Sequence, residues 1–168
     1  MIETNKFPEF RTGIGFDVHR FDSNRPLILG GVKIREINGL AGHSDADVVL
    51  HAICDALLGA AGQGDIGKLF PDTDEKYRNI DSKNLLESVA RKLADNNWSV
   101  GNVDLVVITE SPKISAYSEK MSEVIAEILS VAPGAVSIKG TTSERLGFTG
   151  RGEGIACMAT AMIRRKVS

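Results

Sequence analysis

The sequence contains little cysteine and no dominant charge of either sign, and both features restrict the class of protein. Its two cysteines, Cys54 and Cys157, stand far apart, so neither a disulfide framework nor a cysteine-based metal motif is expected. Both are predicted to be small, buried hydrophobic residues in a reducing compartment. The net charge is −2 and no block of like charge occurs, so no nucleic acid or membrane partner is expected.

Long apolar segments are missing as well. No apolar run approaches the ~20 residues that a membrane-spanning helix needs. Residues 1–10 lack the basic start and apolar core of a signal peptide, so a cytoplasmic protein is expected. The chain has 168 residues, of which 42% are apolar and 25% charged, as is typical of one folded domain. We assign that domain to residues 1–168, with residues 1–10 as an N-terminal extension.

Alternating strand and helix patterns predict an α/β (α+β) fold, in which helices cover one face of a mixed sheet with some parallel strand pairs. Residues 45–62 show helical spacing, and Ser44 with Asp47 is predicted to form a capping box there. Residues 62–79 show no period and are interpreted as a functional loop and candidate lid. Strand hairpins are expected near both ends of the chain. The remaining predicted elements are strands at 11–19, 26–34, 103–109, 136–140 and 154–165, and helices at 82–96 and 115–130.

The segment GIGFDVHRF places a carboxylate and an imidazole on one face of a predicted strand. Asp17 and His19 are two residues apart, and residues i and i+2 of a strand point the same way. His51 lies on the first predicted helix, four residues from Asp47 and from Asp55, and a neighbouring carboxylate can orient a metal-bound ring. Asp17, His19 and His51 would offer Zn²⁺ two nitrogens and one oxygen, with one position open for substrate. An exposed strand face without metal fits the same spacing.

The segment KGTTSERLGFTGRGEG combines flexible glycines with groups that suit phosphate. The hydroxyls of Thr141, Thr142 and Ser143, bare backbone N–H groups and the guanidinium of Arg151 can bind phosphate oxygens, and Glu144 can bind a divalent cation that accompanies them. A glycine-rich turn without a ligand is the alternative. The segment TESPK, 109–113, ends the predicted central strand, where sheets with parallel pairs often bind ligands, although a lone lysine after a proline, such as Lys113, normally belongs to a solvated turn.

These segments, together with HSDAD and GDIGKLFPDTD, resemble one family closely. GFDVH, HSDAD with the histidine that follows, DIGKLFPDTD and TTSERLGFTGRGEGIAC occur in the order typical of the 2-C-methyl-D-erythritol 2,4-cyclodiphosphate synthases of the non-mevalonate isoprenoid pathway. The resemblance covers residues 12–165. It implies a lyase that converts a substrate bearing a CDP group and a 2-phosphate to a cyclic diphosphate and releases CMP. It also implies homotrimers with active sites at subunit interfaces.

The resemblance implies a role for each matching residue. The zinc ligands would be Asp17, His19 and His51, and Glu144 would hold Mg²⁺ or Mn²⁺ between the phosphates. His43 and Thr142 match positions assigned to stabilisation of the transition state. Substrate contacts would come from Asp17, His19, His43, Ser44, Asp65, Ile66, Gly67, Phe70, Pro71, Asp72, Thr73, Asp74, Thr109, Glu110, Ser111, Pro112, Lys113, Ile114, Ser115, Thr141, Thr142, Ser143, Glu144, Phe148 and Arg151.

The chain departs from the more usual family pattern at several of these positions. Relatives often have Ala and Gln where this chain has Thr109 and Glu110, and threonine is commoner than serine at Ser143. Contacts made by backbone groups would tolerate the first change, and Ser143 keeps the hydroxyl.

A further departure concerns the apolar channel that the family's trimers enclose on the threefold axis, lined by residues such as Phe16. Some members close this channel with an arginine that matches Arg151 and a glutamate that matches Met158. Because that glutamate is missing here, we hypothesise that the channel holds an anion, such as phosphate, sulfate or an isoprenoid diphosphate. An Arg151 that turns outward, or that pairs with Glu153, is the alternative.

Two other functions fit the motifs. A zinc-dependent hydrolase of nucleotide diphosphates would use a metal-bound hydroxide and release acyclic products. A non-catalytic cytidine-nucleotide-binding module would bind CMP or CDP without turnover. Analysis of the products by phosphorus NMR would distinguish all three.

Overall fold

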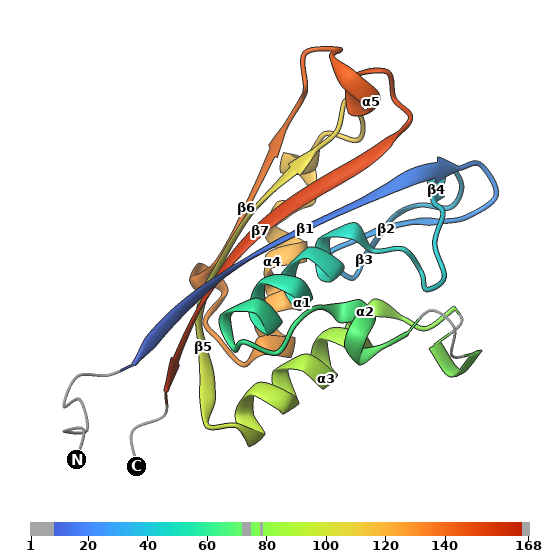
Figure 1. The fold of residues 1–168 in the computed structure, drawn as a ribbon. Coiled ribbons are helices and arrows are strands. Elements are labelled where there is room, and N and C mark those ends of the chain that lie inside the picture. Colours follow the sequence, from blue (N-terminus) through green and yellow to red (C-terminus); the bar gives the residue numbers. More distant parts are fainter. Residues whose placement is uncertain (1–8, 72–74, 78, 166–168) are drawn as a thin grey trace, which may run out of the picture.

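The computed structural model describes residues 9–71, 75–77 and 79–165. The chain forms a five-stranded mixed sheet with helices on one side and a separate two-stranded sheet (Figure 1). The strands are β1 (Phe10–Asp22), β2 (Leu27–Leu29), β3 (Val32–Arg35), β4 (Gly39–Leu40), β5 (Trp98–Ile108), β6 (Val136–Thr141) and β7 (Gly154–Arg165). The helices are α1 (Val48–Ala60), α2 (Ile66–Leu69), α3 (Ser82–Asp95), α4 (Ser118–Leu129) and α5 (Gly147–Gly150), with 3₁₀ turns η1 (Glu75–Tyr77), η2 (Ile114–Ala116) and η3 (Pro133–Ala135).

The mixed sheet confirms the predicted fold class, but the hairpins predicted near both ends of the chain are not part of this sheet. The order is β4-β1-β7-β5-β6, in which only β5 and β6 are parallel. The C-terminal strand β7 lies between β1 and β5 and is antiparallel to both. It therefore does not pair with β6, the strand that precedes it in the sequence. The predicted strand 26–34 is instead the hairpin of β2 and β3. It turns at Gly30 and Gly31, whose φ angles of 58° and 74° favour glycine.

Two glycines of β1 allow α1 to lie directly against the strand. A methyl group on Gly13 would lie 2.0 Å from the carbonyl oxygen of Ala56, and one on Gly15 would lie 2.0 Å from that of Ala52. Any larger residue at either position would push the helix away, because real carbon–oxygen contacts are much longer. The glycines therefore bring the side chains of α1 within reach of the inward face of β1.

The core lies between the sheet and its helices. The inward residues of β5 and β7, such as Val103, Leu105 and Ile163, are buried against α1, α3 and α4. Ten of the thirteen residues of α1 are buried, which explains why its apolar pattern extends around most of the helix. The predicted capping box is wrong in its detail, because Asp47 itself is the N-cap and accepts hydrogen bonds from Val49 N and Leu50 N.

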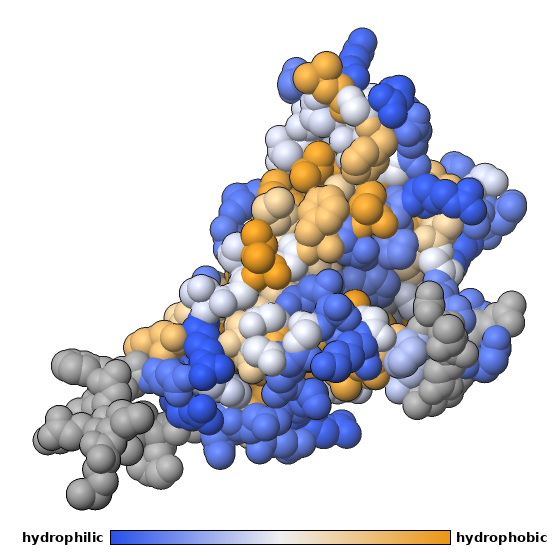
Figure 2. All heavy atoms as spheres, viewed as in Figure 1, coloured by the Kyte–Doolittle hydropathy of each residue, from blue (hydrophilic) through white to orange (hydrophobic). Residues whose placement is uncertain are grey.

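The other face of the sheet leaves large apolar side chains exposed. Ile14, Phe16 and Val18 alternate along β1 with the inward residues, and Phe16 pairs with Met158 on β7. Their exposed fractions run from 40% for Met158 to 64% for Ile14. Figure 2 shows hydrophobic side chains gathered on the surface over β1 and β7. We call Ile14, Phe16, Val18 and Met158 the apolar sheet face.

Several predicted boundaries shift in the structure. The loop at 62–79 contains α2 and η1, and the predicted helix at 115–130 begins only at Ser118, after the turn η2. The strand predicted from 103 starts at Trp98, and Phe10 belongs to β1 and not to an N-terminal extension. Within the described residues, no helix is long and apolar enough to cross a membrane.

Candidate metal and substrate site

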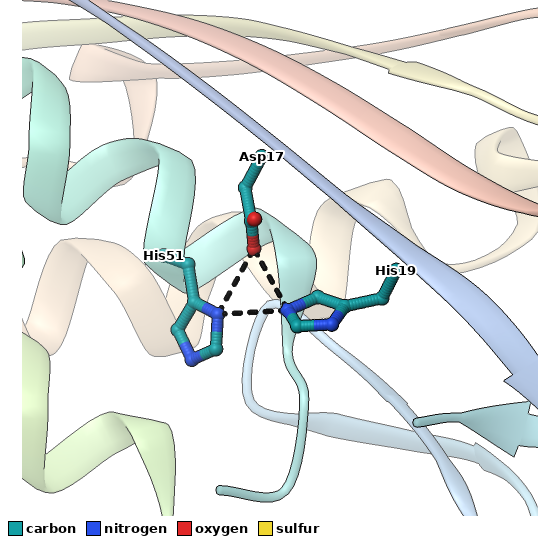
Figure 3. Close-up of side chains that lie close together, drawn as sticks. All are labelled: Asp17, His19 and His51. Carbon is teal, nitrogen blue, oxygen red and sulfur yellow. Dashed lines mark hydrogen bonds and ion pairs between the residues drawn. The ribbon is translucent and has the colours of Figure 1, made fainter. Parts of the chain in front are cut away.

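Three side chains predicted to bind zinc converge between β1 and α1 (Figure 3). Asp17 Oδ2 lies 3.0 Å from His19 Nε2 and 2.9 Å from His51 Nδ1, and the two ring nitrogens are 3.2 Å apart. Asp17 and His19 come from successive inward positions of β1, and His51 comes from α1. The spacing that the sequence left ambiguous therefore produces a cluster of one oxygen and two nitrogens.

Hydrogen bonds on the far side of each ring determine which nitrogen faces this cluster. His19 Nδ1 lies 2.7 Å from the carbonyl oxygen of Ala41, which can only accept, so Nδ1 carries the proton and Nε2 is left as a lone pair. His51 Nε2 lies 2.9 Å from Ser82 Oγ, and the Ser82 hydroxyl donates its one proton to Asp45. Ser82 must therefore accept from His51 Nε2–H, and the Nδ1 lone pair of His51 faces the cluster.

This donor set fits a transition-metal cation. Two imidazole lone pairs and a carboxylate oxygen that point at one another repel unless a proton or a cation lies among them. Two histidines and a carboxylate are common ligands of catalytic Zn²⁺ and leave one position for substrate. The hydrogen bonds to Ala41 and Ser82 are the kind of contact that orients metal-bound histidines.

The electrostatics of the cluster agree with this geometry. Burial by itself raises the pKa of Asp17, but hydrogen bonds and charge from His19 and His51 together lower that pKa well below its usual range. For His19, burial lowers the pKa, and the hydrogen bond and charge of Asp17 outweigh it, so the pKa is raised. Asp17 thus stays an anion, which is the form that binds a cation.

The carboxylates expected to orient His51 are not the ones that do so. Asp47 accepts from Gly30 N at 2.9 Å and Gly31 N at 2.6 Å in addition to capping α1, and burial raises its pKa to about 6. Asp55 accepts from Ile66 N at 2.7 Å. Both carboxylates therefore join loops to α1. His51 Nε2 instead contacts Ser82 Oγ, which Asp45 holds, and lies 3.1 Å from Ser44 Oγ; sequence reasoning missed the contacts of Ser82 and Asp45.

Of the two residues in the Asp45–Ser82 contact, only Asp45 belongs to a motif that the sequence analysis singled out, HSDAD. Its Oδ2 also accepts from the backbone N of Ser82 at 3.1 Å, so Asp45 holds both the backbone and the hydroxyl of the first residue of α3. Ser82 is fully buried, and it lies 37 positions after Asp45 in the sequence. No periodic pattern connects positions that far apart in the chain.

Replacing Ser82 with alanine is expected to weaken metal binding. The change removes the acceptor for His51 Nε2–H, although Ser44 Oγ lies 3.1 Å from the same nitrogen and can replace part of the contact. We expect zinc affinity to fall about tenfold, the low end of the range for orienting contacts. Competition with a chelator measures this affinity. Ser88→Ala, on the exposed side of α3, is the matched control, and equal affinity in both variants would contradict the role of Ser82.

A hollow of about 370 Å³ opens beside the cluster. Of the residues predicted to contact substrate, it is lined by His19, His43, Ser44, Ile66, Gly67 and Phe70, joined by His51, Tyr77, Ile80 and Leu85. His43 Nε2 is buried and has no hydrogen-bond partner among the described residues, which leaves a polar group for a ligand. Asp65 caps α2 by accepting from Lys68 N at 2.8 Å, and Pro71 is exposed outside the lining. The predicted contacts at Asp72, Thr73 and Asp74 lie outside the described residues.

A second hollow, of about 400 Å³, lies at the carboxyl ends of the parallel strands β5 and β6. It is lined by Thr109, Glu110, Pro112, Lys113, Ile114, Ser115, Gly140, Thr141 and Thr142. Ser111 lines a neighbouring hollow with Thr109 and Glu110. Residues 109–115 and the first threonines of the TTSE segment, which the resemblance gave separate roles, therefore meet at one hollow. In Figure 1 this end of β6 lies near α5, away from the middle of α1.

The remaining predicted contacts, Ser143, Glu144, Phe148 and Arg151, do not line that second hollow. Glu144 accepts from Thr142 Oγ1 at 2.7 Å, and Phe148 is 40% exposed. Arg151 donates to both carboxylate oxygens of Glu153, at 2.6 and 3.2 Å. Within the single chain Glu153 therefore gives Arg151 a carboxylate partner, which is the alternative stated above.

Comparisons with known proteins identify the family. Residues 10–164 match the YgbB family, and the chain belongs to it. A Thiobacillus denitrificans protein named 2-C-methyl-D-erythritol 2,4-cyclodiphosphate synthase is 56% identical over 157 residues, 94% of this chain and 98% of that protein. A protein of the same name from Lysinibacillus sphaericus is 52% identical over 157 residues, covering 94% and 99%.

Solved structures share the fold. The bifunctional IspDF of Campylobacter jejuni matches with a TM-score of 0.92 and 43% identity, over 95% of this chain and 43% of that chain. The CDP complex of the Plasmodium falciparum protein IspF matches with a TM-score of 0.84 and 34% identity, over 96% of this chain and all of that one.

Proposed function

We propose that the chain converts 4-diphosphocytidyl-2-C-methyl-D-erythritol 2-phosphate to 2-C-methyl-D-erythritol 2,4-cyclodiphosphate and releases CMP. The observation that carries this proposal is the cluster of Asp17, His19 and His51, whose ring lone pairs are directed at one point beside a hollow. The names of the relatives and the second hollow, at the segment expected to bind cytosine, support the same substrate. The proposed enzyme acts as one domain in the cytoplasm, where the buried free thiols of Cys54 and Cys157 would stay reduced.

In the proposed reaction an oxygen of the 2-phosphate attacks the β-phosphorus and forms the new P–O bond. The bond between the β-phosphorus and the oxygen bridging to the α-phosphorus breaks, and CMP leaves with that oxygen and its electron pair. The attacking phosphate is already anionic near neutral pH, so the reaction needs no strong general base. The protein has to hold both ends of a flexible substrate and stabilise negative charge on the phosphates.

The residues of the two hollows divide these tasks in the proposal. His43 and Ser44 would bind the phosphate of the methylerythritol part, and Thr142 would meet the diphosphate and stabilise charge with His43. Zn²⁺ held by Asp17, His19 and His51 would polarise and position a phosphate oxygen. Glu144 would hold Mg²⁺ or Mn²⁺, which neutralises charge between the phosphates.

We also propose that the active enzyme is a homotrimer with shared active sites. The two hollows have no lining residue in common, so a substrate that uses both needs an arrangement that brings them together. The apolar sheet face supports such an assembly, because clustered exposed apolar side chains mark interaction surfaces. In the single chain Arg151 is paired with Glu153. That the channel of the proposed trimer holds an anion or an isoprenoid diphosphate stays a prediction, which a structure of the trimer with a bound ligand would test.

One assay tests the proposed reaction. The purified chain is incubated with the diphosphocytidyl substrate, Zn²⁺ and Mg²⁺, and the products are followed by phosphorus NMR. We expect CMP and a cyclic diphosphate in equal amounts. Acyclic phosphate products would support the zinc hydrolase instead. Tight binding of CDP without turnover would support the non-catalytic binding module.

Replacing Glu144 with glutamine is expected to weaken the use of the second metal. Glutamine keeps the oxygen that accepts from Thr142 but loses the negative charge that binds a cation. We expect the Mg²⁺ concentration for half-maximal activity to rise about tenfold, because a charge-assisted contact contributes roughly 1.5–3 kcal/mol. Zinc content should not change. Glu127→Gln on α4 is the control, and an unchanged Mg²⁺ requirement in E144Q would exclude Glu144 as the ligand.

A further inference from the structure

Two of the positions at which this chain departs from the usual family pattern, Glu110 and Ser143, contact each other. Glu110 Oε1 accepts from the backbone N of Ser143 at 3.1 Å, and from Ser143 Oγ and the backbone N of Arg145 at 3.4 Å each. Glu110 follows β5 and Ser143 follows β6, and these parallel neighbours end at the same edge of the sheet. A carboxylate that follows one strand therefore holds the loop that follows the other.

The loop held by Glu110 has an unusual backbone. Glu144 and Arg145 are consecutive residues with φ angles of 53° and 63°, in the left-handed region that non-glycine residues rarely adopt. This conformation is unfavourable for residues with a side chain, because the Cβ atom comes too close to the following carbonyl oxygen. It also turns the N–H groups of Ser143 and Arg145 toward one oxygen, in the manner of backbone concavities that bind anions. The Glu110 carboxylate is the anion in this concavity.

Other contacts hold the loop on its remaining sides. Ser143 Oγ lies 2.8 Å from Thr149 Oγ1 of α5, and Leu146 N donates to Ser143 O at 2.9 Å. A methyl group on Gly150 would lie 2.2 Å from the carbonyl carbon of Arg145, so α5 lies directly on the loop backbone. On the side facing β5, it is Glu110 that contacts the loop.

The same loop carries Thr142 and Glu144, whose side chains are joined by a 2.7 Å hydrogen bond. Thr142 lines the second hollow together with Glu110 itself. We propose that Glu110 is a positioning residue for this diphosphate-binding loop, because it ties the loop's strained backbone to the segment that lines the cytidine side of the hollow. This inference rests on the proposed function in one respect, namely that the loop binds the diphosphate.

The test compares Glu110→Ala with Glu110→Gln. Alanine removes the acceptor, whereas glutamine keeps a neutral oxygen in the same place, so the glutamine variant should be rescued in large part. By calorimetry with Mg²⁺ present, we expect CDP affinity to fall at least about tenfold in E110A, since two or three charge-assisted hydrogen bonds are lost. E110Q should stay within about threefold of the natural chain, because a neutral hydrogen bond is roughly half as strong. Glu127→Ala, which removes an exposed carboxylate from α4, is the control.

A second measurement, amide hydrogen exchange, tests the role of Glu110 whether or not the proposed function is correct. Hydrogen exchange at the amides of Ser143 and Arg145 should become faster in E110A, while exchange in β5 and β7 and the zinc content stay unchanged. If E110A binds CDP as tightly as the natural chain, or if E110Q is as weak as E110A, Glu110 does not position the loop through its acceptor oxygen. If the natural chain itself fails to bind CDP, the proposed function is wrong, and the amide exchange still decides whether Glu110 holds the loop.

Discussion

Replacing His51 with alanine is expected to abolish both stoichiometric zinc binding and activity while the fold is retained. Asp17 and His19 alone are too few ligands for a stable catalytic site. A bound metal contributes several kcal/mol to stabilising transition-state charge, so we expect activity to fall at least about 1,000-fold. Metal analysis of the purified variant measures the zinc, and the CMP assay measures the activity. Stoichiometric zinc in H51A would overturn the ligand assignment.

His43→Ala is the matched control for this variant. His43 lines the same hollow but lies outside the metal cluster of the described residues, so the variant should keep its zinc and lose activity. Circular dichroism should show the same secondary structure for both variants, since the core between the sheet and the helices does not include the metal ligands. Together the two histidine variants separate metal binding from substrate binding.

A charge on the apolar sheet face is expected to dissociate the proposed trimer. Phe16 is 50% exposed in the single chain, so Phe16→Glu should be tolerated by the isolated subunit. In the trimer the change would bury like charges close together on the threefold axis, which is strongly unfavourable without counter-ions. Light scattering should show monomers, and activity should fall at least about 100-fold, the effect of roughly 3 kcal/mol.

Ser88→Glu adds the same charge to an exposed position of α3, on the opposite side of the sheet, and serves as the control. It should remain trimeric and active. A monomeric but fully active F16E variant would refute the shared-site arrangement, whereas a trimeric F16E variant would show that subunits associate through another surface.

The sequence predicted most of this architecture because its signals are local. Helices α1 and α3 followed from apolar spacing, and Asp17 with His19 followed from the alternation of a strand. Strand order could not be read in the same way, because the pairing of β1 with β7 joins the two ends of the chain. The Asp45–Ser82 contact and the Glu110–Ser143 contact also join residues more than thirty positions apart, so no periodic pattern contains them.

The resemblance to a family supplied what periodicity could not, namely which polar residues belong to a site. It brought the segments from Thr109 and from Thr141 into one prediction, and the structure places them around one hollow. Neither the resemblance nor the spacing gave the orientation of the side chains, which is why helical spacing placed Asp47 and Asp55 beside His51 and why the pairing of Arg151 with Glu153 was left open. Those outcomes depend on hydrogen-bond geometry, which residue type leaves open.

The two faces of strand β1 have different roles, and the register of the strand determines which residues lie on each face. Its odd-numbered residues from Gly13 to His19 face α1 and supply the close helix contact and two metal ligands, while its even-numbered residues from Ile14 to Val18 form the apolar face. A strand that slips by one residue exchanges its two faces completely. A single-residue insertion before Gly13 would thus direct Phe16 toward His51 and turn Asp17 outward. Metal binding and the proposed assembly would then fail together, whereas a substitution such as Phe16→Glu alters only one of the two faces.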